Sequence, residues 1–299
     1  MIELPQQLPP LQPIESDCLR EHNVTLNVLR LDLMHPTLHG NKWFKLKHNL
    51  RQARDEGHHT LLSFGGAWSN HLRALAAAGN LFGFRTIGIV RGEIPQPLNP
   101  VLQFAHDQGM ELVPMSRSDY RLHRNPAALA ALEARYSDCY VLPEGGSNAL
   151  AVRGCAELAG LLRWQTTGRP RVVGLACGTG ATLAGLVWGL QQQIGRDAEP
   201  IEVVGVGVLK ALGMLAEAVT RRLPAAVDIP WQILERYHGG GYARVTPELE
   251  RFMTQFTARH AVPLEPVYSG KLMFGLLDQV RNGAIPVGSE VLALHSGGL

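Results

Sequence analysis

Short runs of consecutive apolar residues alternate with segments of helical periodicity along most of the chain. Runs rich in Val, Ile and Leu are typical of strands buried on both faces, as in parallel sheets. Such runs occupy residues 60–64, 86–90, 111–115, 139–143, 171–176, 202–208 and 290–295. Because helical patterns separate many of these runs, the sequence predicts an α/β protein.

The predicted strands, roughly eight, are more than one small open sheet usually holds. The sequence therefore predicts two open, mostly parallel sheet domains. A chain of 299 residues is long enough to bury a core for each domain. We expect a large domain from residues 1–48 and 150–299, and a smaller α/β domain from residues 49–149.

Composition narrows the function only slightly. The formal net charge is +2, and the arginines are scattered without interleaved aromatic residues, so no nucleic-acid partner is predicted. The uncharged run at 172–190 approaches the length of a membrane span. Its five glycines favour a buried strand, a turn and a helix instead, so no membrane partner is expected.

The cysteines and the N-terminal residues bear on location. The four cysteines are Cys18, Cys139, Cys155 and Cys177. They form no C-x-x-C pair, so the sequence predicts no metal site and favours a reducing compartment. The first residues show no basic segment followed by an apolar one, so no signal peptide is visible. We expect a cytoplasmic protein.

Three glycine-rich turns give the first indication of a ligand site. They are "FGGAWSNH", "PEGGSNA" and "ACGTGAT", and each lies between a predicted strand and a predicted helix. Backbone N–H groups at such a turn, together with the helix dipole, suit a phosphate or a carboxylate. The alternative for any one turn is an ordinary helix cap by Ser or Thr. Several turns at the carboxyl ends of parallel strands favour a ligand site.

A nicotinamide-dependent oxidoreductase is the alternative from another enzyme class. In "CGTGATLAG", glycines 178 and 180 are followed by Leu183, where the dinucleotide fingerprint has its third glycine. The strand at 202–208 also ends without an acidic residue to bind a ribose. Both departures disfavour this alternative.

The distribution of lysine gives the second signal. The chain has five lysines, at positions 42, 45, 47, 210 and 271, and three of them lie within "HGNKWFKLKHNL". Lys42 opens an amphipathic helical segment, where the helix dipole disfavours a protonated amine and so favours a nucleophile. The alternative is a solvated helix face. A reactive amine together with a phosphate-binding turn is what pyridoxal phosphate requires.

Taken together, the motifs resemble a known enzyme family. "HGNKWFKLKHNL", "SFGGAWSNHLRALA", "PEGGSN", "CGTGATLAG", "EPVYSGKLMFGL" and "LHSGG" occur in the order found in the 1-aminocyclopropane-1-carboxylate deaminase/D-cysteine desulfhydrase family. That family has the fold-type II architecture of pyridoxal phosphate enzymes. The resemblance covers the chain from about residue 28 onward. It implies pyridoxal 5'-phosphate in the cleft between two domains, a small amino-acid substrate and a homodimer.

The resemblance also implies residue roles. Lys42 matches the lysine that binds the cofactor covalently, and Lys45 matches a lysine near the cofactor phosphate. Ser69 matches a serine near the substrate carboxylate and the reacting carbon, and Asn70 matches an asparagine that reaches the cofactor's phenolic oxygen. We expect His71 to complete the carboxylate site with these two residues.

The remaining roles lie in the second half of the chain. The phosphate cradle corresponds to Gly178, Thr179, Gly180, Ala181 and Thr182. Tyr268 matches an active-site tyrosine, and Tyr242 matches a second one. Lys42, Ser69, Tyr242 and Tyr268 are therefore the predicted catalytic residues. Ser296 is predicted to face the pyridine nitrogen of the cofactor.

Departures from the deaminase pattern concern the substrate. Ser269 stands where the deaminases have Glu, "HSGG" at 295–298 is similar to the H-T-G-G of the desulfhydrases, and His71 replaces a Gln. A hydroxyl cannot hold a pyridinium as a carboxylate does, so loss of a good leaving group is favoured over opening of a cyclopropane. We predict a lyase that converts D-cysteine to pyruvate, ammonia and sulfide by α,β-elimination. The alternatives are a 1-aminocyclopropane-1-carboxylate deaminase, another D-amino-acid lyase or racemase, and a binding protein that has lost catalysis.

Overall fold

The computed structural model describes residues 2–3, 7–122, 125–163, 171–193 and 201–298. The chain forms two compact units. Lys42–Ala151 makes up the first unit, to which residues 2–3 also belong, and the second unit contains the described residues of 7–41 and 152–298. The smaller domain expected at 49–149 falls inside the first unit.

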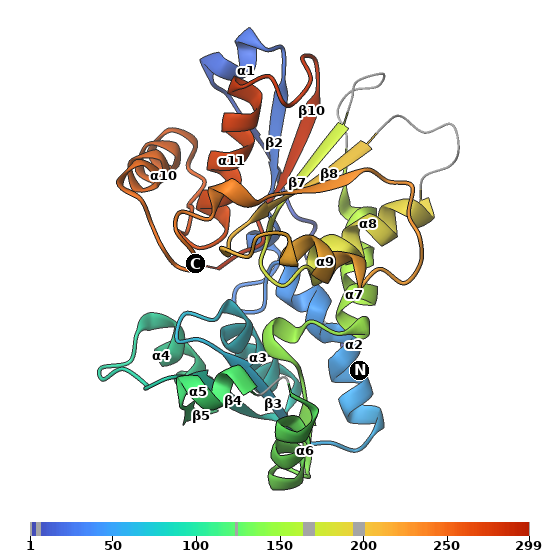
Figure 1. The fold of residues 1–299 in the computed structure, drawn as a ribbon, viewed down its shortest axis with the longest axis vertical. Helices are drawn as coiled ribbons and strands as arrows, with labels where there is room; N and C mark the ends of the chain where they lie inside the picture. Colours follow the sequence, from blue (N-terminus) through green and yellow to red (C-terminus); the bar gives the residue numbers. More distant parts are fainter. Residues whose placement is uncertain (1, 4–6, 123–124, 164–170, 194–200, 299) are drawn as a thin grey trace. The chain divides into compact units, whose positions relative to one another are not determined.

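Four parallel strands form the sheet of the first unit, in the order β5-β4-β3-β6 (Figure 1). They are β3 (Thr60–Gly65), β4 (Arg85–Arg91), β5 (Met110–Met115) and β6 (Cys139–Val141). Each coincides with a predicted apolar run. The helices are α2 (Asn41–Asp55), α3 (Asn70–Phe82), α4 (Pro100–Asp107), α5 (Arg117–Leu122), α6 (Pro126–Arg135), the 3-10 helix η2 (Glu144–Gly146) and the start of α7 (Ala149–Ala156).

Six strands form the sheet of the second unit, in the order β1-β2-β10-β7-β8-β9, and only β1 runs antiparallel to its neighbour. They are β1 (Leu11–Ile14), β2 (Thr25–Leu29), β7 (Arg171–Cys177), β8 (Ile201–Gly207), β9 (Trp231–Leu234) and β10 (Glu290–Leu294). The helices are α1 (Asp17–Glu21), η1 (Leu31–Leu33), η3 (Glu157–Leu161), α8 (Ala181–Gln193), α9 (Met214–Thr220), η4 (Glu235–Tyr237), α10 (Pro247–His260) and α11 (Ser269–Arg281).

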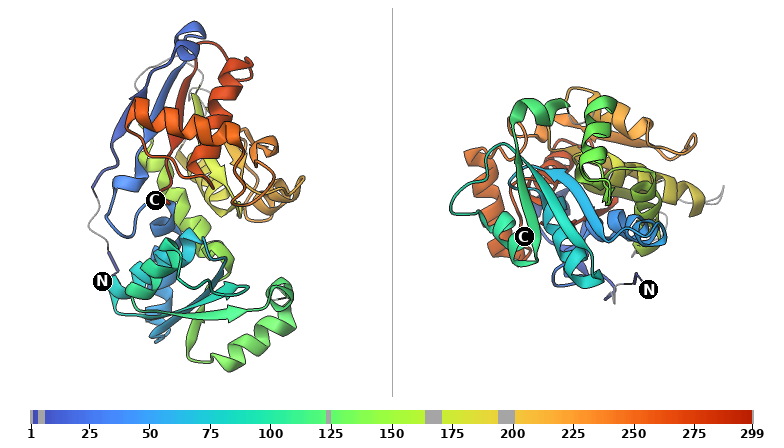
Figure 2. Two further views of the ribbon diagram at one scale, coloured as in Figure 1. Left: turned by 90° about the vertical axis from the view of Figure 1, so that its left-hand side faces the viewer. Right: turned by 90° about the horizontal axis from the view of Figure 1, so that it is seen from below.

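Helices cover both faces of the second sheet (Figure 2). A side chain at Gly174 of β7 would meet Leu276 of α11, whereas one at Gly205 of β8 would meet Leu183 of α8. The sheet is therefore enclosed between α11 on one face and α8 on the other. This arrangement explains why its parallel strands are apolar at nearly every position.

The predicted fold class, two mostly parallel sheets with covering helices, is confirmed. Strands β1, β2 and β9 were not predicted. β1 contains Pro13, which is tolerated because β1 is an edge strand. β2 carries Asn27 at a buried position, which interrupts an apolar run.

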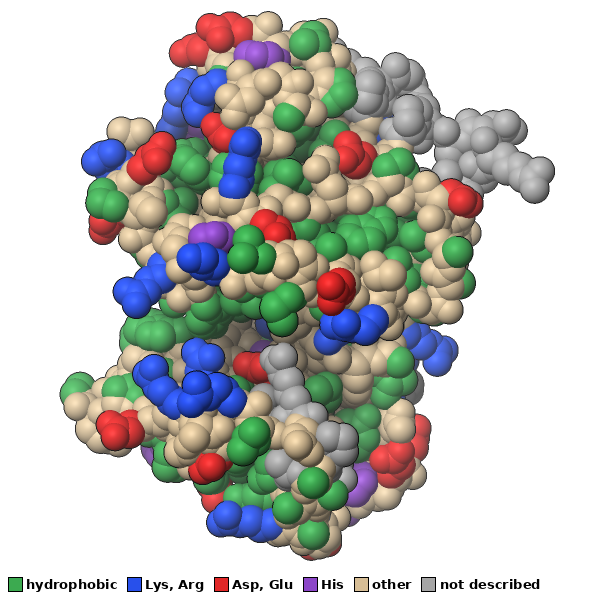
Figure 3. All heavy atoms as spheres, viewed as in Figure 1, with side chains coloured by type: hydrophobic (Ala, Val, Ile, Leu, Met, Phe, Trp, Pro, Cys, Tyr) green, Lys and Arg blue, Asp and Glu red, His purple; other side chains and the backbone are tan. Residues whose placement is uncertain are grey.

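The uncharged run at 172–190 becomes β7, a glycine turn and α8, as predicted. Among the residues that the structure describes, no helix combines the length and apolar character that a membrane crossing needs. Basic and acidic side chains both occur across the face shown in Figure 3.

Candidate active site

The carboxyl ends of β2, β10, β7 and β8 meet at one edge of the second sheet, because these strands are parallel neighbours. The last described strand, β10, lies between β2 and β7. The segment at 295–298 and the turn at 178–182 therefore leave the sheet at the same edge. Both contain residues predicted to bind the cofactor, and this is the edge where open α/β sheets bind ligands.

The turn at 178–182 has the features of an anion site. Gly180 has a φ of +85°, a conformation that favours glycine, and α8 begins at the next residue. The first turn of α8 contains no acidic side chain, so the positive end of its dipole is uncompensated. Asn41 donates its side-chain N–H to Thr182 Oγ1 at 2.8 Å, which fixes the threonine in place.

The two predicted tyrosines lie together in the second unit. The rings of Tyr242 and Tyr268 are 6.3 Å apart between centroids and meet edge to face at 73°. A side chain at Gly178 would lie 3.4 Å from Cε1 of Tyr268. The tertiary structure thus brings the glycine turn and the tyrosine pair together, although 90 residues of sequence separate Gly178 from Tyr268.

Ser269, the first residue of α11, and Glu265 bond to each other's backbone. Its Oγ accepts a hydrogen bond from the backbone N–H of Glu265 at 2.9 Å. The Glu265 carboxylate in turn accepts from the N–H groups of Val267, Tyr268 and Ser269 at 2.8, 2.5 and 2.7 Å. This reciprocal arrangement satisfies N–H groups at the start of the helix and fixes the backbone of Tyr268.

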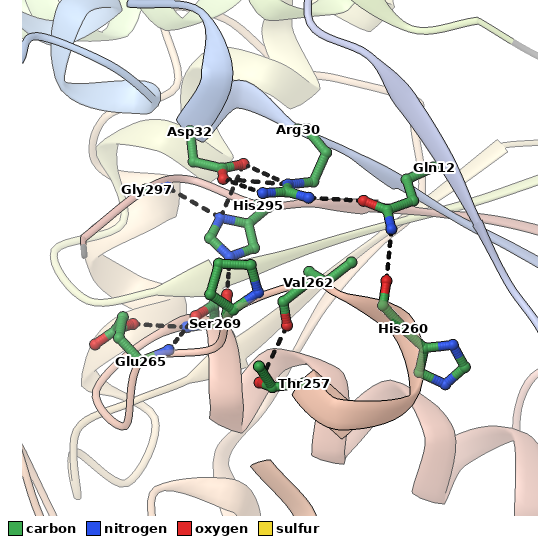
Figure 4. Close-up of polar contacts among 11 residues, drawn as sticks. Gln12, Arg30, Asp32, Thr257, His260, Val262, Glu265, Ser269, His295 and Gly297 are labelled. Carbon is green, nitrogen blue, oxygen red and sulfur yellow. Dashed lines mark hydrogen bonds and ion pairs between the residues drawn. The ribbon is translucent and has the colours of Figure 1, made fainter. Parts of the chain in front are cut away.

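A buried ion-pair network underlies the segment at 295–298 (Figure 4). Arg30 donates to both oxygens of Asp32, at distances of 2.7 to 3.1 Å, and to Gln12 Oε1 at 2.6 Å. His295 Nδ1 lies 3.3 Å from Asp32 Oδ1, and His295 Nε2 donates to the Pro263 carbonyl at 2.7 Å. Both ring nitrogens of His295, the residue before Ser296, therefore have polar neighbours.

In the first unit, Ser69, Asn70 and His71 lie at the start of α3. Ser69 is the N-cap residue, and its Oγ accepts from the Leu72 N–H at 3.3 Å. A side chain at Gly65 would lie 2.5 Å from Ser69 Oγ, so the close approach of β3 to this hydroxyl requires glycine. Asn70 is the first residue of α3 and is partly exposed.

His71 is buried and neutral. Burial, Lys45 and Lys42, in that order of effect, hold its pKa well below 6.5. Ser63 Oγ lies 2.8 Å from His71 Nε2 and donates to the Leu142 carbonyl at 3.0 Å. His71 Nε2 thus has the Ser63 hydroxyl as its hydrogen-bond partner, and Nδ1 is buried without a partner within the described residues.

These contacts do not test the expected carboxylate role of His71. It stays a prediction, as do the carboxylate roles of Ser69 and Asn70.

Lys42 and Lys45 lie in the first turns of α2, which contain no acidic residue. Lys42 is partly buried, and Lys45 is almost fully buried. Lys45 Nζ donates to the Gly145 carbonyl at 3.0 Å and to Ser147 Oγ at 3.1 Å. Lys45 thus orders the "PEGGSN" turn, a contact that the sequence did not predict.

Comparisons with known proteins decide the family. The family of pyridoxal-phosphate dependent enzymes matches the chain over residues 7–297. The chain belongs to this family. It is 28% identical to D-cysteine desulfhydrase of Klebsiella pneumoniae, over 87% of this chain and 82% of that protein.

Two further matches agree. The chain is 28% identical to the bifunctional mitochondrial D-cysteine desulfhydrase/1-aminocyclopropane-1-carboxylate deaminase of Arabidopsis thaliana, over 91% of this chain and 72% of that protein. A crystal structure of an ACC deaminase homologue superposes with a TM-score of 0.84 at 26% identity, covering 99% of this chain and 91% of that chain. The family predicted from the motifs is confirmed, and so is pyridoxal phosphate as the cofactor.

The residues present fit the cofactor. The turn at 178–182 ends at a helix N-terminus without acidic side chains, as a phosphate group requires. Lys42 stands in the first turn of α2, where the helix dipole favours the neutral amine. Both features belong to a pyridoxal-phosphate-dependent enzyme of the lyase type.

Several residues of the site escaped sequence reasoning. They are Asn41, Glu265 and the pair Arg30 and Asp32. Glu265 precedes Ser269 by four residues, an order and spacing that differ from the capping box, so no standard cap signal is present in the sequence here. The sequence offers no signal for the contact between Asn41 and Thr182, because these residues are 141 positions apart.

Proposed function

We propose that the protein catalyses α,β-elimination of D-cysteine to pyruvate, ammonia and sulfide. The observation that carries this proposal is the local structure after Tyr268. The side chain there is the Ser269 hydroxyl, which accepts from the Glu265 N–H, and the nearby Glu265 carboxylate accepts from three backbone N–H groups. Both groups thus serve the backbone at the start of α11, and the position directly after Tyr268 offers a hydroxyl in place of a carboxylate for the pyridine nitrogen.

This arrangement favours a substrate with a good leaving group. Bound pyridoxal phosphate supplies an electron sink next to the substrate Cα. Without a carboxylate at the ring nitrogen that sink is weaker, which suffices when thiolate departs from Cβ. In the proposal, the hydroxyl of Ser296 faces the ring nitrogen and accepts or donates a hydrogen bond without fixing a charge there.

The residues of the first unit bind and deprotonate the substrate in this proposal. Lys42 holds the cofactor and takes the proton from Cα with its Nζ. Ser69 and Asn70 orient the substrate carboxylate, and the Asn70 amide also reaches the phenolic oxygen of the cofactor. Lys45 orders the turn at 145–147 and contributes positive charge toward the phosphate.

The residues of the second unit bind the phosphate and move the second proton. The backbone N–H groups of residues 178–182 bind the phosphate, with Thr182 held by Asn41. The phenols of Tyr242 and Tyr268 orient the substrate and deliver a proton to the departing sulfur. Their edge-to-face contact supports a shared role.

A second candidate is deamination of 1-aminocyclopropane-1-carboxylate. The name of the Arabidopsis relative carries both activities, which supports this second candidate. The proposal also includes the homodimer and the cytoplasmic location expected from the sequence. Sedimentation velocity of the purified protein would test the homodimer.

The test is an assay of purified, cofactor-loaded protein with D-cysteine, L-cysteine and 1-aminocyclopropane-1-carboxylate. Sulfide and keto-acid release are followed side by side. Sulfide and pyruvate from D-cysteine, without 2-oxobutyrate from the cyclopropane, are the expected result. Release of 2-oxobutyrate at a comparable rate would contradict the argument from Ser269 and Ser296.

The lysine is tested separately by Lys42→Ala. This variant should lose the visible absorbance of covalently held cofactor and the elimination activity together. Lys47→Ala is the matched control, since Lys47 lies in the same helix and has no proposed role in catalysis. Retention of the absorbance band and of turnover in Lys42→Ala would overturn the assignment.

A further inference from the structure

Lys271 is a buried lysine that the proposed chemistry does not use. It is the third residue of α11, and its side chain is completely buried. A cation in the first turn of a helix faces the positive end of the dipole, and a buried ammonium loses its hydration. Burial accordingly lowers the pKa of Lys271 to about 8, while Glu265 acts in the opposite direction. A position this unfavourable for a charge requires compensating contacts.

Three backbone carbonyls provide those contacts. Lys271 Nζ donates to the carbonyl of His238 at 2.7 Å, to that of Gly241 at 2.9 Å and, more weakly, to that of Val208 at 3.5 Å. An ammonium group has three N–H donors, so each carbonyl can receive one. Lys271 therefore ties α11 to the end of β8 and to the loop at 238–241.

The hydrogen bonds within the loop join near neighbours only: the His238 carbonyl accepts from the Gly241 N–H at 3.1 Å, and the Gly241 carbonyl accepts from the Arg244 N–H at 3.2 Å. Gly239, Gly240 and Gly241 have φ values of 62°, 98° and 138°, a run of conformations that favours glycine. A run of three glycines loses more backbone entropy on ordering than any other sequence. Inside the loop, His238 Nδ1 accepts from the Gly240 N–H at 2.8 Å. The Lys271 ammonium adds buried, charged hydrogen bonds to the His238 and Gly241 carbonyls of this loop.

The loop leads directly into Tyr242. The ring of Tyr242 packs edge to face on Tyr268, and Tyr268 precedes Lys271 by three residues. The same short segment thus supplies one tyrosine of the pair and the side chain that holds the loop carrying the other. We propose that Lys271 is a positioning residue whose ammonium fixes the 238–241 loop and so holds the Tyr242 phenol beside Tyr268. This inference rests on the proposed function, in which the two phenols act together.

The three hydrogen bonds from Lys271 to the carbonyls depend on protonation of its amine. Loss of a proton leaves an amine with two N–H donors, so one of the three carbonyls loses its partner and the other two bonds lose their charge. Because the pKa of Lys271 is about 8, the loop should loosen as the pH rises through that value. The Glu265 carboxylate favours the ammonium. The segments that Lys271 joins also carry the His238 imidazole, which faces the Gly240 N–H, the Arg244 side chain beside Gly240, and the phenols of Tyr242 and Tyr268.

Hydrogen–deuterium exchange of the holoenzyme tests the inference without reference to turnover. The variants are Lys271→Met, which cannot donate, and Lys271→Arg, which stays charged. Lys210→Met is the matched control, since Lys210 is exposed. At about pH 7, Lys271→Met should raise exchange of the loop amides about tenfold, the effect of losing a hydrogen bond from a charged donor. The control should leave it unchanged.

The pH response gives an independent comparison. Loop exchange in the unmodified protein, corrected for the intrinsic rate, should rise between about pH 7 and pH 9, and in Lys271→Arg it should not. With D-cysteine, Lys271→Met should lower kcat more than it changes KM, and Lys271→Arg should move the alkaline loss of kcat to higher pH. If Lys271→Met fails to fold, the comparison of the unmodified protein with Lys271→Arg decides the question.

Two results would overturn the inference. One is loop protection in Lys271→Met equal to that of the unmodified protein at about pH 7, and the other is the same pH response in Lys271→Arg as in the unmodified protein. Absence of turnover with every substrate tested would overturn the proposed function instead. The exchange data would then still decide whether Lys271 fixes the loop.

Discussion

Replacement of Asp32 by Asn should strongly destabilise the second unit. The Arg30 and Asp32 side chains are only 7% and 6% exposed. The carboxylate receives three short contacts from the Arg30 guanidinium and lies 3.3 Å from His295. Asp32→Asn keeps the shape of the side chain but leaves the guanidinium buried without its counter-charge. Breaking a buried pair in this way costs about 3 to 5 kcal/mol.

Urea unfolding followed by far-UV circular dichroism measures the effect. With a slope of about 3 kcal/mol per molar urea, a loss of about 3 kcal/mol lowers the midpoint by about 1 M. Glu217→Gln is the control, because its ion pair with Arg221 is exposed on both sides and should contribute less than about 0.5 kcal/mol. A cost for Asp32→Asn as small as that of the control would refute the reasoning.

The same substitution has a functional readout. His295 lies between Asp32 and the turn at 296–298, so loss of the carboxylate should loosen the backbone that carries Ser296. We expect weaker binding of pyridoxal phosphate, measured by fluorescence titration of the apoprotein. A double variant, Arg30→Met with Asp32→Leu, should be more stable than Asp32→Asn, because it leaves no unpaired buried charge.

Two further predictions concern single side chains. Since burial, Lys45 and Lys42 hold the pKa of His71 well below 6.5, the unfolded chain binds a proton below about pH 6.5 that the native state excludes, and stability falls as the pH falls. His71→Gln should flatten this dependence in urea midpoints measured between about pH 5 and pH 7.5, and an unchanged slope would contradict the neutral state. Gly40→Ala places Cβ 2.0 Å from the Ser296 carbonyl oxygen and should weaken both stability and cofactor binding. Gly57→Ala, with a similar positive φ and open space around it, should cost only about 1 kcal/mol in thermal unfolding, and equal losses for both would refute the clash.

Most of the parallel strands of both sheets could be predicted because their signal is local. β3, β4, β7 and β8 are runs of apolar residues bounded by turns, and their burial on both faces leaves that pattern in the sequence itself. The glycine turn at 178–182 could be predicted for the same reason, since its small residues lie between an apolar run and a helical pattern in the sequence itself.

The edge strands of the second sheet, β1 and β9, could not be predicted, and neither could β2. β1 and β9 have four residues each, which is too short for periodicity to identify them. β2 pairs with β10, which lies some 265 residues further along the chain. Nothing local indicates that pairing, because it is decided by which strand fills the centre of the sheet.

Some features of the candidate site could likewise be predicted from the sequence, and others could not. The sequence by itself determined that Lys42 opens a helix and that Ser69 caps another, since both follow from turn and helix patterns. Only the tertiary structure decided that the Ser269 hydroxyl bonds to Glu265, that His71 is neutral and that Lys271 donates to the loop before Tyr242. The physical reason is that the protonation state and partners of a buried polar group depend on its desolvation and on backbone groups from distant segments. The residues next to such a group in the sequence reveal neither its desolvation nor those distant partners.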